Sequence, residues 1–368
     1  MKRFFDKIYL LIICVVVIAL SVSLFALPDR KFSDKENRTL MSAPVFNSES
    51  VISGEYTKKL ASYFADQFPA RDVFVAFKAY AELLQGKGEN NGIIYTDEGI
   101  LIPRDEIKDD RLYENLDIIS EFEKSIKIDV AVAALPRAVD VFSEFLPKTY
   151  PNNDNKVIWN KFNNAVNDLN LTATNVYDLL CESNAYYHTD HHYTSRGAYL
   201  TYKALGENLG YTPYDEAYFD IQTVDRSFCG TSMRTSGFYL SKKDEITLYR
   251  YDGDNSYSVI ADGKTIDLYN FSKLGTTDKY AVFLDGNHAR VDIEKGSGRE
   301  RLVIIRDSFA DSLAPFLAMH YDIILIDLRY YNESVIELVE QENISKVLIL
   351  ENISELATAK NISYLKMK

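Results

Sequence analysis

A C-terminal stretch of alternating apolar runs and polar turns limits the fold more than any other part of the sequence. Residues 301–353 read RLVIIRDSFADSLAPFLAMHYDIILIDLRYYNESVIELVEQENISKVLILENI. The pattern indicates strand, turn, helix, strand, loop, helix and strand, and its short, continuously apolar runs are typical of parallel strands buried on both faces. The stretch therefore predicts an α/β sheet covered by helices.

The same alternation is present earlier in the chain. A helical pattern over 112–125 leads to a strand pattern over 128–136, and another over 156–169 leads to a strand-like segment near Val176. Thr194 is a suitable N-cap for a helix that runs to about Leu209. Further expected elements are two short amphipathic helices from Glu55 with a break at Pro69, a hairpin over 91–102, and β-hairpins or an insertion over 210–300.

An uncharged apolar run near the N-terminus, Ile8–Leu27, has the length that a helix needs to cross a membrane core of roughly 30 Å. Lys2, Arg3 and Lys7 precede it, so the positive-inside rule predicts a cytoplasmic N-terminus and an extracytoplasmic chain after the run. A cleaved signal peptide is the competing interpretation, but the run is long for one, and Leu24 stands where a cleavage site needs a small residue. We expect an uncleaved, single-pass anchor in the cell membrane.

The sequence thus divides into four predicted parts. These are a cytoplasmic N-terminus (1–7), a transmembrane anchor (8–27), a juxtamembrane stalk (28–54) and an extracytoplasmic domain (55–368). The net charge of −13, without a Lys/Arg-rich run, argues against a nucleic-acid partner. Cys181 and Cys229 do not have the spacing of a zinc site, and we expect neither a cofactor nor a metal.

Ser308 follows the predicted strand 302–306 at a turn that leads directly into a helix. Ligands of open α/β sheets bind at the carboxyl ends of the strands, and amides at the start of a helix can stabilise a developing oxyanion. Ser308 is therefore placed like a nucleophile, although serine and aspartate at such a turn are also preferred helix caps.

A histidine-rich stretch, YYHTDHHYTSRGAY over 186–199, holds three of the five histidines of the chain. In its Asp-x-His arrangement, Asp190 and His192 project to the same side if the segment is extended. Asp190 could then orient the imidazole of His192, which would take the proton of Ser308. His191 would point away from this base.

The same histidines allow two other interpretations. His188, His191 and His192 have the i, i+3, i+4 spacing of metal ligands on a helix, with Asp190 as a further ligand. Thr194, however, predicts that the helix begins only after them, which weakens the metal interpretation. A polar loop without a chemical role is the remaining alternative.

Several blocks of the sequence resemble one known family. TDHHYT resembles the Asp-His-His-Trp signature of the DHHW family, whose members are similar to the alginate O-acetylation proteins and have an SGNH-hydrolase-like fold. Tyr193 replaces the Trp of the signature. Further similar blocks, in the family's order between about Lys31 and Leu350, are FSDKENRTL, SGEY, DQFPARD, NGIIYTDEGILI and the most specific one, RDSFADSLAPFLAMHYDIILIDLRYY.

The resemblance implies an SGNH-hydrolase-like parallel sheet flanked by helices, with a triad order that is circularly permuted relative to ordinary SGNH esterases. By motif, Asp190 would orient the base, His192 would be the general base and Ser308 the acyl-accepting nucleophile. The implied chemistry is acetyl transfer to, or removal from, an extracellular polysaccharide. A membrane-bound O-acyltransferase often supplies acetyl groups in such systems, which makes one a candidate partner.

Four further residues are candidates for oxyanion or substrate contacts. Gly286 and Asn287, in FLDGNHA, match the glycine and asparagine amides that SGNH-like enzymes use as oxyanion donors, although Asp-Gly-Asn is also an ordinary turn. Tyr193 and Arg306 are candidates for substrate binding. Arg306 and Arg329 flank apolar strands near the expected rim of the site, where surface ion pairs are equally expected.

The sequence therefore predicts a membrane-anchored protein that transfers acetyl groups to a cell-surface polysaccharide, or hydrolyses acetyl esters on one, through Ser308, His192 and Asp190. A non-catalytic glycan-binding or envelope-assembly protein on the same fold is the alternative, and a metallohydrolase is a third hypothesis.

Overall fold

The computed structural model describes residues 2–33, 35–36, 38–107, 110–148, 150, 155–183, 185–296 and 298–367. The chain forms two compact units, Met1–Asn90 with Arg234–Leu240, and Asn91–Met233 with Ser241–Lys368. Met1 of the predicted cytoplasmic segment, and Asp34 and Asn37 of the predicted stalk, lie outside the described residues.

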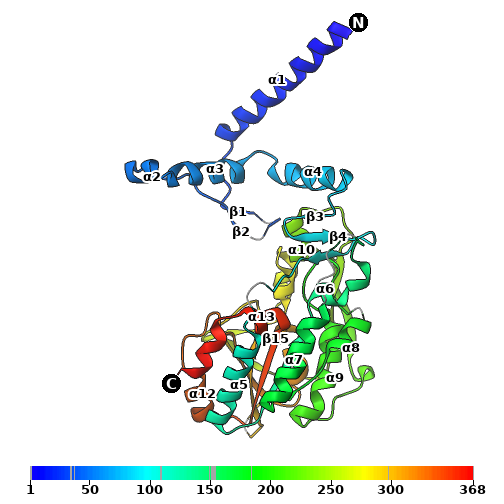
Figure 1. The fold of residues 1–368 in the computed structure, drawn as a ribbon, viewed down its shortest axis with the longest axis vertical. Helices are drawn as coiled ribbons and strands as arrows, with labels where there is room; N and C mark the ends of the chain where they lie inside the picture. The colour runs from blue at the N-terminus through cyan, green and yellow to red at the C-terminus, as the bar shows by residue number, and fades with distance from the viewer. Residues whose placement is uncertain are drawn as a thin grey trace. The chain divides into compact units, whose positions relative to one another are not determined.

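The first unit begins with a long apolar helix, α1 (Lys2–Ala26). Its part Phe5–Ala26 has a mean hydropathy of 3.0 and no buried stretch, and it is long and apolar enough to cross a membrane. This agrees with the predicted single-pass anchor. The other elements of the unit are β1 (Phe32–Ser33), β2 (Arg38–Thr39), α2 (Ser48–Ile52), α3 (Glu55–Gln67), α4 (Arg71–Leu84) and β3 (Glu89–Asn90) (Figure 1).

The amphipathic helices α3 and α4 form as the sequence predicts, with Pro69 in the break between them. They belong to the first unit because the extended segment before them binds to α3: the Arg38 guanidinium and the Met41 N–H both donate to the Asp66 carboxylate. The hydrogen bonds from Arg38 lower the pKa of Asp66. Residues 55–90 thus group with the anchor, whereas the sequence placed the start of the second domain at residue 55.

The second unit is built on an eight-stranded mixed sheet in the order β11-β10-β12-β14-β13-β15-β6-β7. The strands β14, β13, β15, β6 and β7 are parallel, as predicted, whereas β10 and β12 add an antiparallel edge that the sequence did not reveal. The bounds are β11 (Lys264–Ile266), β10 (Ser258–Ala261), β12 (Arg290–Glu294), β14 (Asp322–Ile326), β13 (Arg301–Arg306), β15 (Lys346–Asn352), β6 (Val130–Leu135) and β7 (Thr172–Ala173).

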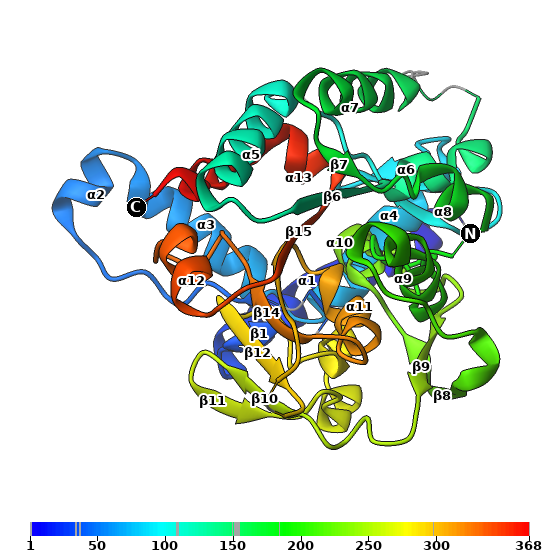
Figure 2. The same cartoon turned by 90° about the horizontal axis from the view of Figure 1, so that it is seen from below.

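Helices cover both faces of this sheet, because alternate strand residues point to opposite sides. Leu302 and Ile304 of β13 join one apolar core, and Val303 and Ile305 join the other. Figure 2 shows α5 and α7 on one side of the strands and α9 and α11 on the other. One face carries α5 (Leu112–Ile126), α7 (Asn155–Leu169), α12 (Val335–Gln341), α13 (Ile353–Thr358) and η5 (Asn361–Lys366), and the other α6 (Ala138–Val141), α8 (Tyr177–Ser183), α9 (Ser195–Leu209) and α11 (Ala310–Leu317).

Two antiparallel pairs and short turns complete the second unit. The predicted hairpin is confirmed as β4 (Ile93–Tyr95) and β5 (Leu101–Pro103), with Gly99 at a positive φ of 80°. The strand predicted near Val176 is displaced: β7 ends at Ala173, and α8 begins directly after Val176. The remaining elements are β8 (Asp220–Phe228), β9 (Asp244–Arg250), η1 (Ser143–Phe145), η2 (Glu216–Tyr218), η3 (Phe271–Gly275), η4 (Lys279–Val282) and α10 (Thr231–Ser236), which from Arg234 on belongs to the first unit.

Candidate active site

Ser308 lies on the turn between β13 and α11, at the carboxyl edge of the parallel strands. Asp307 holds this turn, since one of its carboxylate oxygens accepts from the Phe309 N–H (3.0 Å) and the other from the Asn352 N–H at the end of β15 (2.7 Å). The helix begins at Ala310 without a side-chain cap, so Ser308 is not the cap residue that the alternative interpretation suggested. Its hydroxyl is free to bond elsewhere.

The hydroxyl of Ser308 is hydrogen-bonded to His192, and His192 is hydrogen-bonded to Asp190. His192 Nε2 lies 2.7 Å from Ser308 Oγ, and His192 Nδ1 lies 2.6 Å from Asp190 Oδ1. A carboxylate can only accept, so Nδ1 carries the proton and Nε2 is left to accept from Ser308. The structure therefore brings together the three residues that the sequence singled out.

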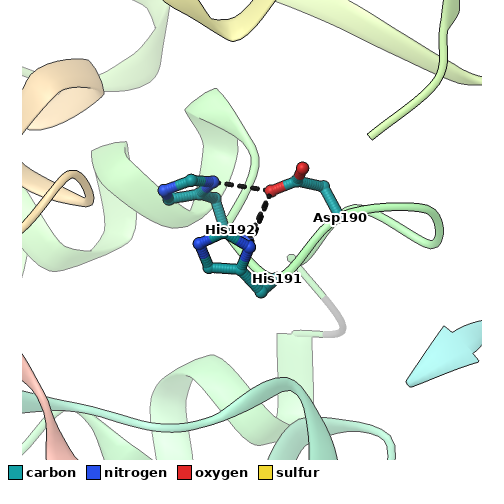
Figure 3. Close-up of side chains that lie close together, drawn as sticks. All are labelled: Asp190, His191 and His192. Atoms are coloured by element: carbon teal, nitrogen blue, oxygen red, sulfur yellow. Dashed lines mark hydrogen bonds and ion pairs between the residues drawn. The ribbon is translucent and has the colours of Figure 1, made fainter. Parts of the chain in front are cut away.

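The local conformation around Asp190 differs from the extended segment that was expected. The His192 N–H donates to Asp190 Oδ1 (3.0 Å), so the chain turns and both groups reach the same carboxylate. Contrary to expectation, His191 does not point away: its Nδ1 is 3.5 Å from Asp190 Oδ1, and its ring lies 3.9 Å from that of His192 (Figure 3). Asp190, His191 and His192 are close enough to hold a metal ion, but they precede α9 and His188 is not part of this group, so the predicted helical set of metal ligands does not form.

Asp190 is 2% exposed and is surrounded by donors. Burial by itself would raise the pKa of its carboxyl, but the nearby His191 and His192, the hydrogen bond from His192 and the Thr231 N–H (2.6 Å) hold that pKa well below its usual range. Gly230 allows this approach, because a Cβ there would lie 2.3 Å from Asp190 Cβ. Gly230 and Thr231 were missed, since nothing local in the sequence ties them to residue 190.

Aromatic side chains fix the base and the turn. The Tyr280 ring stacks on His192 at 4.1 Å with an interplanar angle of 10°, and its hydroxyl donates to the Ser308 carbonyl oxygen (3.3 Å). Tyr193 is fully buried, and its hydroxyl donates to the Phe309 carbonyl oxygen (2.7 Å). Tyr193 is therefore a support of the turn, which corrects its predicted role in substrate binding.

Arg306 also differs from its predicted place at the rim. Its side chain is 0% exposed and lies 3.2 Å from the Asp311 carboxylate and 3.8 Å from that of Asp327. Burial, opposed by Arg306, raises the pKa of Asp311 to about 7. Arg306 is a buried ion-pair partner and does not reach a polymer, because the last residue of β13 turns into the core.

A cavity of about 340 Å³ opens beside Ser308. Its wall includes His191, Ser232, Arg329, Asn352 and Glu355. Arg329, expected near the rim, is held by Asp327 through Nε (2.9 Å) and Nη2 (2.6 Å), which raises the pKa of its guanidinium. The Ser232 hydroxyl is buried and has no hydrogen-bond partner among the described residues, so it can donate to a ligand.

Gly286 and Asn287 are absent from the described residues that line this cavity. The chain passes through positive φ angles from Leu284 to Gly286, and Asn287 is exposed to solvent just before β12. The positive φ angles favour the turn interpretation for this segment, and the cavity lining gives no support to the predicted role of Gly286 and Asn287 as oxyanion donors.

The fold and the site together define a class: an α/β protein with a hydrogen-bonded Asp-His-Ser chain at the carboxyl edge of a mostly parallel sheet. The model of the DHHW protein family matches residues 118–326, more than half of the sequence, and the chain belongs to this family. The resemblance inferred from the sequence is confirmed.

A DHHW family protein and PatB1, both with solved structures, share the fold of this chain. A DHHW family protein from Eubacterium siraeum is 19% identical with a TM-score of 0.62, and the match covers 76% of this chain and 96% of that one. PatB1 from Bacillus cereus, solved with a sulfonyl adduct, is 18% identical with a TM-score of 0.60, over 75% and 99% of the two chains. The O-acetyltransferase domain of Pseudomonas putida AlgJ is 14% identical with a TM-score of 0.47, over 75% and 98%. No curated protein matches the chain.

Proposed function

We propose that this protein transfers acetyl groups to an extracellular polysaccharide, or removes them from one, through an acetyl-enzyme on Ser308. The observation that carries the proposal is the position of His192, which bonds Asp190 through Nδ1 and Ser308 through Nε2. This is the arrangement in which a general base activates a serine. The Asp-His pair precedes the serine in the chain, as in an SGNH-like triad of permuted order.

The proposed reaction has two balanced halves. In the first, the Ser308 proton passes to His192 Nε2, a bond forms between Ser308 Oγ and the acetyl carbonyl carbon, and His192 returns the proton to the leaving oxygen as its bond to that carbon breaks. In the second, a sugar hydroxyl or water gives its proton to His192 and its oxygen bonds the acetyl carbon, and His192 returns the proton to Ser308 Oγ as the bond between Oγ and that carbon breaks. Asp190 keeps the imidazole in the tautomer with the proton on Nδ1.

Substrate contacts would come from the cavity wall. The Ser232 hydroxyl, which has no hydrogen-bond partner among the described residues, is one candidate donor, and Arg329, which Asp327 fixes in place, is the candidate contact for a polar polymer. The α1 helix would hold the protein at the outer face of the membrane. A membrane-bound O-acyltransferase is the proposed source of acetyl groups, as the family resemblance implies.

The first test is turnover of p-nitrophenyl acetate by the full-length protein in detergent. We expect wild type to release nitrophenol, and Ser308→Ala and His192→Ala to fall together to background, because triad residues act as a unit. The exposed Ser363→Ala is the control, and EDTA tests the metal hypothesis. Equal turnover by wild type and both triad variants would refute the triad.

A second test labels the proposed nucleophile. Sulfonyl fluorides react with activated serine hydroxyls, and a structure of the related PatB1 carries a sulfonyl adduct. We expect one adduct on wild type, located at Ser308 by mass spectrometry, and none on His192→Ala. Sugar binding that persists in Ser308→Ala, with no adduct on wild type, would favour the alternative of a non-catalytic glycan-binding protein.

A further inference from the structure

The helix α4 in the first unit exposes an apolar stripe. Val73, Phe77 and Leu84 are 66%, 72% and 90% exposed, and their spacings of four and seven residues place them on one face of the helix. Leu240, which is 83% exposed, lies next to this stripe, since its N–H donates to the hydroxyl of Tyr80 on α4 (3.0 Å). We call these four apolar residues the α4 patch.

The α4 patch is separate from the face through which α4 packs inside its own unit. The other side of α4 packs within the same unit: Ala79 is 1% exposed, and Val75 lies 2.9 Å from the position that a Cβ on Gly237 would take. The helix therefore has a buried face and, on the opposite side, a second apolar face in contact with solvent. Soluble proteins rarely keep such a face without a partner.

The end of the membrane-spanning helix is tied to α3, which directly precedes α4. The Tyr63 hydroxyl donates to Asp29 (2.9 Å), the Gln67 side chain makes two hydrogen bonds to the backbone of Arg30 (2.8 and 2.9 Å), and the rings of Phe25 and Phe64 are 6.5 Å apart. Asp29 and Arg30 follow the end of α1 within four residues. Within this unit, α3 and α4 follow one another, and α1 runs obliquely to both (Figure 1).

We propose that the α4 patch lies in the lipid–water interface of the membrane that α1 crosses. The α4 helix begins at Arg71, four residues after Gln67, so the tether keeps the patch close to the bilayer surface, where lipid is always the most abundant apolar partner. An amphipathic helix in this position binds with its axis in the plane of the interface. The inference requires α1 in the membrane and is independent of the acyl-transfer chemistry.

The test uses full-length protein in phospholipid nanodiscs. Single cysteines, Phe77→Cys or Leu84→Cys, are introduced after replacement of Cys14, Cys181 and Cys229 by alanine, and are labelled with an environment-sensitive nitrobenzoxadiazole dye. The matched control is Lys78→Cys, an exposed position on the side of α4 away from the patch. A chain that keeps only Cys14, inside α1, is the positive control for insertion.

We expect blue-shifted emission at positions 77 and 84, with loss of fluorescence when doxyl-labelled lipid is included, and water-like, unquenched emission at 78. Water-like emission at all three positions, with Cys14 quenched, would overturn the proposal. Blue-shifted but unquenched emission at 77 and 84 would assign the patch to a protein partner or a second copy. An unquenched Cys14 would show that α1 does not lie in the membrane, and this would overturn the proposal as well.

Discussion

His192 is the residue on which the proposed chemistry depends, and several independent contacts fix the position of its ring. Its ring is held at one nitrogen by Asp190, it is stacked on Tyr280, and its own N–H is bound to the same aspartate. A base fixed in this way needs little rearrangement when the proton moves, which is the basis of preorganised catalysis.

Replacing Asp190 by asparagine is expected to leave the fold unchanged but to move the imidazole proton of His192 from Nδ1 to Nε2. The amide can donate to Nδ1, which would place the imidazole proton on Nε2, facing Ser308. We expect turnover of p-nitrophenyl acetate to fall by roughly 10³–10⁴, by analogy with other triads. The control is Asp215→Asn, whose side chain is 92% exposed. Unchanged turnover in Asp190→Asn would contradict the role of Asp190.

The buried carboxyl group of Glu351 predicts a pH dependence of the protein's stability. It is 4% exposed, and burial, followed by the nearby Asp307 and Glu355, raises its pKa well above the usual range. Above pH ~4.3, Glu351 therefore keeps its proton in the folded state but loses it in the unfolded chain. Because the folded state then binds more protons, this group lowers the free energy of unfolding as the pH rises above that value. Glu351→Gln removes the titration.

We expect the melting temperature of Glu351→Gln to fall less than that of wild type between pH 5 and 8. Differential scanning fluorimetry across this range measures the difference, and the exposed Glu340→Gln serves as the control. A variant whose melting temperature follows wild type at every pH would show that Glu351 does not contribute to the slope.

At the scale of elements, the segment 230–231 and the turn at 190 must fit each other closely. Gly230→Ala places a Cβ 2.4 Å from the Thr189 carbonyl oxygen and 2.3 Å from Asp190 Cβ, so the backbone has to shift. We expect a loss of about 1–3 kcal/mol in the free energy of unfolding and a clear loss of turnover. Gly275→Ala, where a Cβ meets nothing within 4 Å, is the control. Equal stability of the two variants in urea would contradict this packing.

Elements with a strong local pattern could be predicted from the sequence, and elements defined by distant contacts could not. The helices α3, α4, α5 and α9 and the strands of the C-terminal stretch follow from apolar periodicity and caps; for α9, Thr194 accepts from the Gly197 N–H as predicted. The antiparallel edge of β10 and β12 depends on pairings across the sheet. These pairings leave little trace in a single sequence.

The same distinction applies to the candidate site. Ser308, His192 and Asp190 could be singled out as candidates because a turn after a buried strand and an Asp-x-His motif are local signals. Tyr193 and Arg306 were misplaced, since a sequence does not say which side of a turn faces the core. Contacts such as the Tyr280 ring on His192 join segments 88 positions apart in the chain and carry no local signal.

At the scale of the whole molecule, the α1 helix defines the expected topology. Lys2, Arg3 and Lys7 precede the apolar run, so the N-terminus is expected in the cytoplasm and the second unit outside. Alkaline phosphatase fused after residue 368 should be active in a bacterial host, and the protein should stay with membranes after an alkaline carbonate wash. An inactive fusion, beside an active periplasmic control, would reverse the topology.

The cavity beside Ser308 is assembled from stretches that are far apart in the chain. Its lining comes from residues within 93–105, 137–138, 191, 231–232, 307–309, 329 and 352–358. The pair Asp190 and His192 is held by the backbone N–H of Thr231 and by the ring of Tyr280, neither of which is a side chain of the described cavity lining. If the proposed function holds, exchange of wall side chains would change which polymer is preferred while Asp190, His192 and Ser308 stay in place.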